Sequence, residues 1–348
     1  MSTSPTTTPD NQTIARWRFI GNAHAVRLLA HAAHTQPSHA YLFVGAPHSG
    51  RKTLARRFAQ ALLCEQRDAA PCGVCRTCTL IEQAHHPDVL TLTPETQREL
   101  LGEKTVAAAY KVDAIRALQT ELARRPVEGR YKLLIVADAE RMTTQAANAF
   151  LKTLEEPPSF VVIVLTTTDE ALLLPTIRSR CQVLTLRPVP RTEIETLVRE
   201  HVADAEQAAL IARLSAGRVG WALQAATQPD VLNARREAVD LVHTLLHASY
   251  TDRLEQAAHL AQAERLDVLH TWATWWHDVM LVGAHAEEDI TNIDDLATLR
   301  RVAQHVPRER VLAVLRKLQT TLRLLHETNV QPQLLWETLL LAFPRLTT

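Results

Sequence analysis

The stretch GAPHSGRKT at residues 45–53 has the spacing of a phosphate-binding loop, in which glycines frame a turn and a lysine and a hydroxyl residue follow. Gly45 and Gly50 stand at the glycine positions. Arg51 stands where the lysine is expected, and Lys52 stands where a hydroxyl would bind Mg²⁺. Because backbone N–H groups and a helix N-terminus make the cradle, we expect the loop to keep its shape despite these side chains.

A shift of the motif by one residue would let Lys52 and Thr53 serve as the lysine and the hydroxyl. It would also require glycine at two positions that hold Ala46 and Arg51. Each helical residue turns by about 100°, so a shifted pair would aim both side chains elsewhere. The shifted register is therefore rejected.

The second half of such a site is a pair of acidic residues at the end of a strand, where one holds the metal through water and the next orients the attacking water. The apolar run KLLIV at 132–136 predicts that strand, and Ala137 and Asp138 follow it. Only one acid of the pair remains, so we expect ATP to be bound weakly or not at all and not to be hydrolysed. The candidate residues of this degenerate nucleotide site are Gly45, Gly50, Arg51, Lys52, Thr53 and Asp138.

A cluster of cysteines with the spacing C-x7-C-x2-C-x2-C follows, and its members are Cys64, Cys72, Cys75 and Cys78. Paired cysteines two residues apart can place both sulfurs on one tetrahedral ion, and four thiolates complete a closed site. We therefore expect structural Zn²⁺, with an iron–sulfur cluster or four ordinary thiols as alternatives. The fifth cysteine, Cys181, reads as a small buried strand residue.

Composition narrows the class of protein. The chain has 348 residues, enough for two or three domains, and Lys plus Arg and Asp plus Glu both total 38. Binding of nucleic acid by bulk positive charge is therefore not expected. The polar start MSTSPTTTPDNQT predicts a disordered tail over residues 1–13 and no signal peptide. No apolar run approaches the length of a membrane span, so a cytoplasmic protein is expected.

Apolar runs that predict strands alternate with helical patterns up to about residue 188. The expected strands are AYLFVG (40–45), DVLTLTP (88–94), KLLIVAD (132–138), FVVIVLTTT (160–168) and CQVLTL (181–186). Such alternation predicts a parallel sheet with helices on both faces. Residues 64–86 read as irregular. Beyond Pro188 and Pro190 all patterns are helical, and Trp272, Trp275 and Trp276 are expected to fill a core or a subunit seam.

Several stretches together resemble the clamp-loader branch of the AAA+ family. They are HAYLFVGAPHSGRKTLARRFAQALLC, the cysteine run, HPDV, KLLIVADAERMTTQAANAFLKTLEEPP and TIRSRCQ. The resemblance is dense over residues 16–190 and weaker beyond. It implies an α/β P-loop NTPase-like (AAA+) domain over 14–188 with a zinc-binding insert at 64–78. A small three-helix lid domain over 189–228 and an all-α collar domain over 229–348 would follow.

The resemblance also assigns a role to a Ser-Arg-Cys motif at residues 179–181. In the ATPase subunits of this family, the arginine of the motif reaches the ATP bound by the neighbouring subunit. Arg180, flanked by Ser179 and Cys181, is accordingly the candidate arginine finger acting in trans. An arginine at a developing γ-phosphate charge can be worth roughly 10³–10⁵ in rate. Apart from the family, Arg180 would read as an ordinary surface residue.

Two further positions of the family pattern bear on nucleotide chemistry. Thr166 and Thr167 fall where the family senses the γ-phosphate, but without a nucleotide in cis we interpret them as strand residues. The lid arginine of the active subunits aligns with Gly220 in GRVGWAL. This third departure points, like the first two, to a subunit that does not hydrolyse ATP.

The implied function is that of a non-hydrolysing clamp-loader subunit. Its partners would be the ATPase subunits (gamma/tau) and the delta subunit, with the sliding clamp and primer–template DNA reached through the complex. One alternative is an active AAA+ ATPase subunit that uses Arg51 and Lys52 on phosphate, against which Ala137 argues. Nucleotide binding without hydrolysis stays open. A zinc-dependent nucleic-acid-binding protein is the third interpretation, and neutral net charge argues against it.

Overall fold

The computed structural model describes residues 11–263, 266–325 and 330–346. Its contacts divide the chain into two compact units, with the boundary in the sequence between Pro190 and Arg191. Each unit is described by itself. Within the described residues, no helix has the length and apolar character needed to cross a membrane.

The first unit is built around a sheet of five parallel strands in the order β2-β3-β4-β1-β5. The strands are β1 (Ala40–Val44), β2 (Val89–Leu92), β3 (Lys132–Val136), β4 (Val161–Thr167) and β5 (Gln182–Thr185). Val44 pairs with Thr167 at the carboxyl ends of β1 and β4. The predicted parallel sheet is confirmed, and its register brings the loops that follow these strands to one edge.

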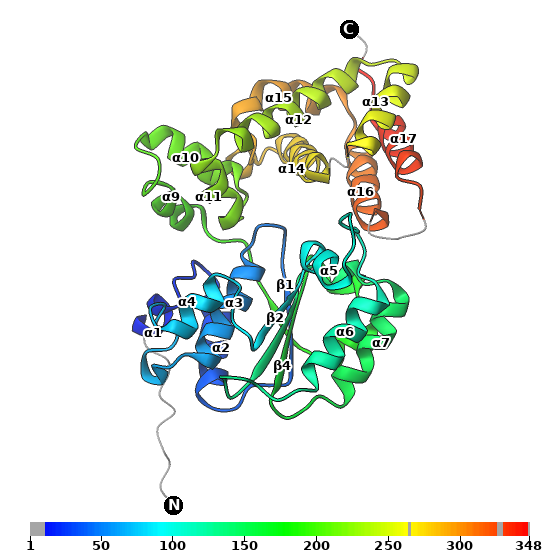
Figure 1. Cartoon of the computed structure of the whole chain (residues 1–348). Coiled ribbons are helices and arrows are strands. Elements are labelled where there is room, and N and C mark those ends of the chain that lie inside the picture. The colour runs from blue at the N-terminus through cyan, green and yellow to red at the C-terminus, as the bar shows by residue number, and fades with distance from the viewer. Residues whose placement is uncertain (1–10, 264–265, 326–329, 347–348) are drawn as a thin grey trace, which may run out of the picture. The chain divides into compact units, whose positions relative to one another are not determined.

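Helices cover both faces of this sheet, as Figure 1 shows. Helices α2 (Ala23–His34) and α3 (Arg51–Leu63) pack on the face that carries Tyr41 and Phe43. Helices α6 (Val112–Leu122) and α7 (Thr144–Glu155) pack on the opposite face. Because both faces are covered, every residue of β1, β3 and β4 is buried, which explains their continuous apolar runs.

The remaining helices of the first unit are short. They are α1 (Asn11–Arg16), α4 (Arg76–Glu82), α5 (Pro94–Leu101) and α8 (Pro175–Arg178), with 3₁₀ turns at Arg67–Ala69, Ala139–Arg141 and Glu170–Leu172. The expectation of an irregular segment over 64–86 is wrong for α4. Residues 1–10 of the expected tail lie outside the described residues, and α1 begins at Asn11.

The second unit is helical throughout its regular structure, as expected. Its helices are α9 (Arg191–Val198), α10 (Ala205–Leu214), α11 (Val219–Thr227), α12 (Pro229–His247), α13 (Tyr250–Gln262), α14 (Leu266–Gly283), α15 (Leu296–His305), α16 (Arg308–Leu324) and α17 (Pro332–Ala342). Trp272, Trp275 and Trp276 of α14 are fully buried and form its core with Trp336. They fill a core, as predicted. The division into lid and collar domains stays a prediction.

Candidate functional site

Gly45 and Gly50 flank the loop that connects β1 to α3. A Cβ atom added to Gly45 would lie 2.8 Å from Ser49 Oγ and 3.2 Å from the carbonyl oxygen of Leu186. Gly50 has φ +92°, in the left-handed region, and an added Cβ would lie 2.9 Å from the Phe19 ring. Both glycines are therefore required by the local backbone and packing, whether or not a nucleotide binds.

The two cations after the loop are both paired with Asp138. Arg51 Nη2 lies 3.2 Å from Asp138 Oδ1, and Lys52 Nζ lies 2.9 Å from Asp138 Oδ2. The Arg51 side chain is 7% exposed, whereas that of Lys52 is 55% exposed. Asp138 itself adopts φ +49°, and its N–H donates to Thr166 Oγ1 at 2.9 Å. A phosphate entering this loop would thus compete with a carboxylate already bound to both cations.

Burial lowers the pKa of Arg51, and the charges of Asp138 and Glu140 oppose that shift. Ser49 Oγ, Arg51 Nη1 and Glu140 Oε2 are buried without a hydrogen-bond partner among the described residues. Thr53 is partly buried in the first turn of α3. The structure therefore brings Arg51, Lys52 and Asp138 into direct contact, with one carboxylate shared by two cations.

The residues at the other positions of the nucleotide pattern are buried and form hydrogen bonds within the chain. Ala137 is 1% exposed, and its carbonyl accepts a hydrogen bond from Tyr110 Oη at 2.7 Å. Thr166 and Thr167 are fully buried, and Thr167 Oγ1 donates to the carbonyl of Asp169 at 2.9 Å. The Thr166 hydroxyl accepts from the Asp138 N–H, so both hydroxyls bond to backbone groups of this chain, which agrees with their interpretation as strand residues.

The Ser-Arg-Cys motif follows the short helix α8. The Arg180 side chain is 34% exposed; its Nη2 donates to Glu155 Oε1 at 2.7 Å and its Nη1 to the Thr176 carbonyl at 2.9 Å. Ser179 Oγ donates to the same carbonyl at 3.2 Å. Cys181 packs against the core, and burial raises the pKa of its thiol to about 12. Arg180 is thus the charged residue of the motif, and its side chain is partly exposed.

The four clustered cysteines meet as their spacing predicts. Their sulfur atoms all lie within 4.8 Å of one another, and the Cys64–Cys75 and Cys72–Cys78 pairs are each 4.0 Å apart. Zn–S bonds of about 2.3 Å in a tetrahedron place sulfurs about 3.8 Å apart, so the cluster fits such an ion with little contraction. None of the five cysteines is in a disulfide, and Cys181 is not part of the cluster.

The environment of the sulfurs also suits a cation. Burial raises the pKa of Cys78, which is fully buried. Burial would likewise raise the pKa of Cys72, but N–H groups of Val74 and Cys75 outweigh it and lower that pKa to about 7. Cys75 caps the N-terminus of α4, where its Sγ accepts from Cys78 N at 3.4 Å. A bound divalent cation would supply the charge that a buried Cys78 thiolate requires.

Two polar residues with specific contacts escaped the interpretation of the sequence. One is Glu155, the partner of Arg180. The other is Asp88 of HPDV, which is fully buried and accepts hydrogen bonds from the N–H groups of Val127, Glu128 and Gly129 at 2.6–2.8 Å. These bonds lower the pKa of Asp88 despite its burial. In the sequence, Asp88 was marked by its place in HPDV, directly before an apolar run, and nothing there indicated its hydrogen-bond partners.

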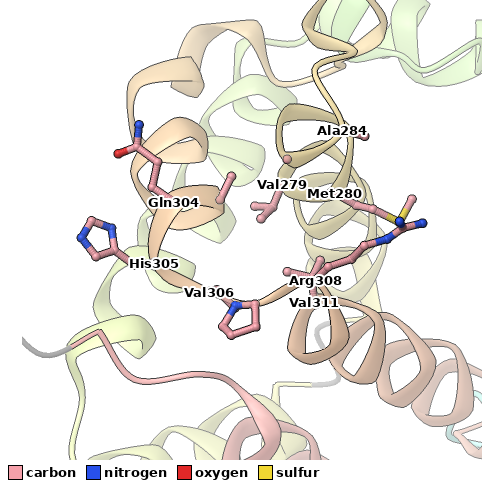
Figure 2. Close-up of a pocket in the computed structure, with 11 residues that line it drawn as sticks. Val279, Met280, Ala284, Gln304, His305, Val306, Arg308 and Val311 are labelled. Atoms are coloured by element: carbon pink, nitrogen blue, oxygen red, sulfur yellow. The ribbon is translucent and has the colours of Figure 1, made fainter.

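The second unit contains a cavity of about 310 Å³. Residues of α14, α15 and α16 line it, as Figure 2 shows, and most of them are aliphatic. His305 and Arg308 are its ionisable residues, and His305 Nδ1 lies 2.8 Å from the carbonyl of Arg301. Besides His305 and Arg308, the lining holds no serine, threonine, cysteine, aspartate or glutamate, so it offers no set of metal ligands.

Comparison with known proteins places these features in a family. The model of the DNA polymerase III delta subunit family matches residues 21–190, and the model of its C-terminal part matches 229–344. The chain is 35% identical over 280 residues to the DNA polymerase III subunit delta′ of Escherichia coli, covering 80% of each chain. The chain belongs to the DNA polymerase III delta/delta′ subunit family. The resemblance to the clamp-loader branch that the sequence indicated is thereby confirmed.

A second delta′ subunit is also similar to this chain. The delta′ subunit of Bacillus subtilis is 33% identical over 208 residues, which cover 60% of each chain. A solved structure of a DNA polymerase III gamma subunit-related protein from Thermotoga maritima is 21% identical and covers 90% of this chain and 96% of that one. Its TM-score is 0.38, so it carries no functional inference. Within the delta/delta′ family, the nucleotide state of this chain, its metal and the role of Arg180 stay predictions.

Proposed function

We propose that this chain is a non-hydrolysing delta′ subunit of a DNA polymerase III clamp loader. It assembles with the ATPase subunits gamma/tau and with delta, and through them acts on the sliding clamp and on primed DNA. Its own contribution to ATP hydrolysis is Arg180, which reaches the ATP of a neighbouring subunit. The four-cysteine cluster holds structural Zn²⁺ and stiffens the segment after α3.

A single observation carries the first part of this proposal: Asp138 binds both Arg51 and Lys52. In a hydrolysing site, the lysine of the loop binds the nucleotide phosphates and the acids of the second strand hold Mg²⁺ and water. Here the remaining acid is paired with both cations, and Ala137 offers no metal ligand. The loop therefore lacks the metal ligand that catalysis in cis requires, and both of its cations are already paired with a carboxylate.

The trans role of Arg180 is supported by the exposure of its side chain and by the shape of its guanidinium group. Its side chain is partly exposed, and the planar fork of its guanidinium matches the oxygens of a phosphate. Such a group adds electrostatic stabilisation where charge develops during phosphoryl transfer. The neighbour supplies the nucleotide, the metal and the water.

The test is ATP turnover by the assembled clamp loader with Arg180→Ala in this chain. We expect a fall of at least tenfold in clamp-stimulated and DNA-stimulated turnover, with the assembly intact by size-exclusion chromatography. Arg178→Ala is the matched control, because Arg178 lies in the same short segment and pairs with Glu170 at 3.4 Å. Full turnover with Arg180→Ala would refute the finger.

The isolated chain tests the remaining part of the proposal. We expect no turnover when the isolated chain is titrated with Mg-ATP, with calorimetry to measure binding and phosphate release to measure hydrolysis. Saturable binding with turnover would establish the alternative, an active ATPase subunit with an atypical loop. Saturable binding without turnover would leave the trans role intact and would show that the glycine loop still holds phosphate.

A further inference from the structure

The Arg180 guanidinium is held from one side by two acceptors. Glu155 Oε1 lies 2.7 Å from Nη2, and the Thr176 carbonyl lies 2.9 Å from Nη1. Glu155 ends α7, and Thr176 belongs to α8, so the two acceptors come from two helices that pack together. Contacts at both terminal nitrogens fix the plane of the guanidinium as well as its position.

The place of Glu155 is not explained by the stability of its own helix. It is the last residue of α7, where the C-terminal end of the helix dipole disfavours negative charge. Its side chain is 48% exposed and fills no core position. Glu155 does have a defined contact, the ion pair with Arg180 across 25 residues of sequence. The position of this carboxylate is therefore explained by its ion pair with Arg180.

The hydrogen bonds leave the guanidinium able to take a further ligand. Arginine has five N–H donors, and within the described residues Arg180 uses one from each terminal nitrogen. Three N–H groups are left, and the side chain is 34% exposed. A phosphate oxygen can therefore be bound without breaking the contact to Glu155.

We propose that Glu155 is a positioning residue for Arg180: its carboxylate holds the guanidinium in the orientation that meets the neighbour's γ-phosphate. This inference rests on the proposed trans role of Arg180. An arginine side chain has many rotamers, and a phosphate must otherwise order it during each encounter. A guanidinium held in advance loses less freedom as the transition state forms, so the effect belongs to the rate of the chemical step.

The structure offers a matched control for this carboxylate. Glu170 pairs with Arg178 at 3.4 Å, in the same segment as Arg180 and with a similarly exposed acid. Glu170→Gln removes an ion pair next to the motif without touching Arg180. It reports any general effect of losing a surface charge or of loosening α8.

The experiment measures ATP turnover against ATP concentration in the assembled clamp loader, with sliding clamp and primed DNA present. Glu155→Gln and Glu155→Ala are each made in the native chain and in the Arg180→Ala chain. We expect Glu155→Gln to lower kcat roughly 3- to 10-fold with KM nearly unchanged, and Glu155→Ala to lower it further. Neither substitution should lower turnover in the Arg180→Ala chain, and Glu170→Gln should leave kcat at its native value.

The outcomes separate this inference from the proposed function. Full turnover with Arg180→Ala overturns the finger itself. Slow turnover with Arg180→Ala but native kcat with both Glu155 variants overturns the positioning role alone. A rise in kcat with Glu155→Gln would show that the ion pair hinders Arg180, and would overturn the positioning role. An equal loss in the Arg180→Ala chain would mark Glu155 as a structural residue only.

Discussion

Replacing Asp138 by asparagine tests the ion cluster that occupies the degenerate loop. The substitution keeps the size of the side chain, and asparagine tolerates the left-handed backbone that Asp138 adopts at φ +49°. The change therefore isolates the loss of charge. Alanine would add backbone strain at the same position and would confuse the measurement.

The expected loss of stability follows from the burial of the two partners. Arg51 is 7% exposed and Asp138 is 20% exposed, so their hydrogen bond is shielded from water. A hydrogen bond to a charged group is worth about 1.5–3 kcal/mol, and an unpaired buried cation adds to the cost. Lys52 is 55% exposed, and its pair contributes less than about 1 kcal/mol. We expect Asp138→Asn to destabilise the first unit by about 2–3 kcal/mol, or roughly 5–10 °C in Tm.

The assay is urea unfolding of the full chain, with hydrogen exchange of peptides from β1 and α3 to report the first unit. Lys52→Ala is the control, with an expected loss below about 1 kcal/mol. A double-mutant cycle with Arg51→Met isolates the pair, because Asp138→Asn should cost little once the buried cation is gone. Equal costs of Asp138→Asn in the native and Arg51→Met chains would refute the reasoning.

Three further predictions concern other charged or metal-binding groups. Cys78→Ser should abolish the binding of one zinc per chain and destabilise the first unit by more than about 3 kcal/mol, whereas Cys181→Ser should keep the metal; elemental analysis and chelator titration check this. Asp88→Asn should cost about 3 kcal/mol at neutral pH, because three N–H groups lose a buried carboxylate. The folded-state pKa of Asp88 is lowered, so its contribution is present above about pH 4 and is lost as pH falls through the folded pKa; pH-dependent unfolding should show a flatter acid limb in the variant. His243 Nε2 donates a hydrogen bond to the Asp295 carboxylate at Oδ2, 2.7 Å away, and this bond raises the pKa of His243. Its contribution is complete below about pH 6.5 and is lost as pH rises through the folded pKa, so His243→Gln should flatten the fall in stability of the second unit above that pH.

Short-range patterns were sufficient for much of the fold. The strands and the helices that flank them follow from runs and periodicities that extend over five to thirteen residues. The helix α4 was missed because its seven residues give too little periodicity, and its start is set by the Cys75 sulfur accepting from Cys78 N. The strand β2 begins one residue later and ends two residues earlier than the predicted range 88–94.

The sequence by itself determined the loop scaffold, the cysteine cluster and the loss of the metal-binding acid, because each depends on residue type at a fixed local spacing. Only the tertiary structure decided what replaces the lost chemistry. Arg51 and Asp138 are 87 residues apart, and they meet because β4 alone separates β1 from β3 in the sheet. Glu155 and Arg180 meet because α7 packs against α8. Such pairs depend on strand order and helix packing, which no local pattern of residues specifies.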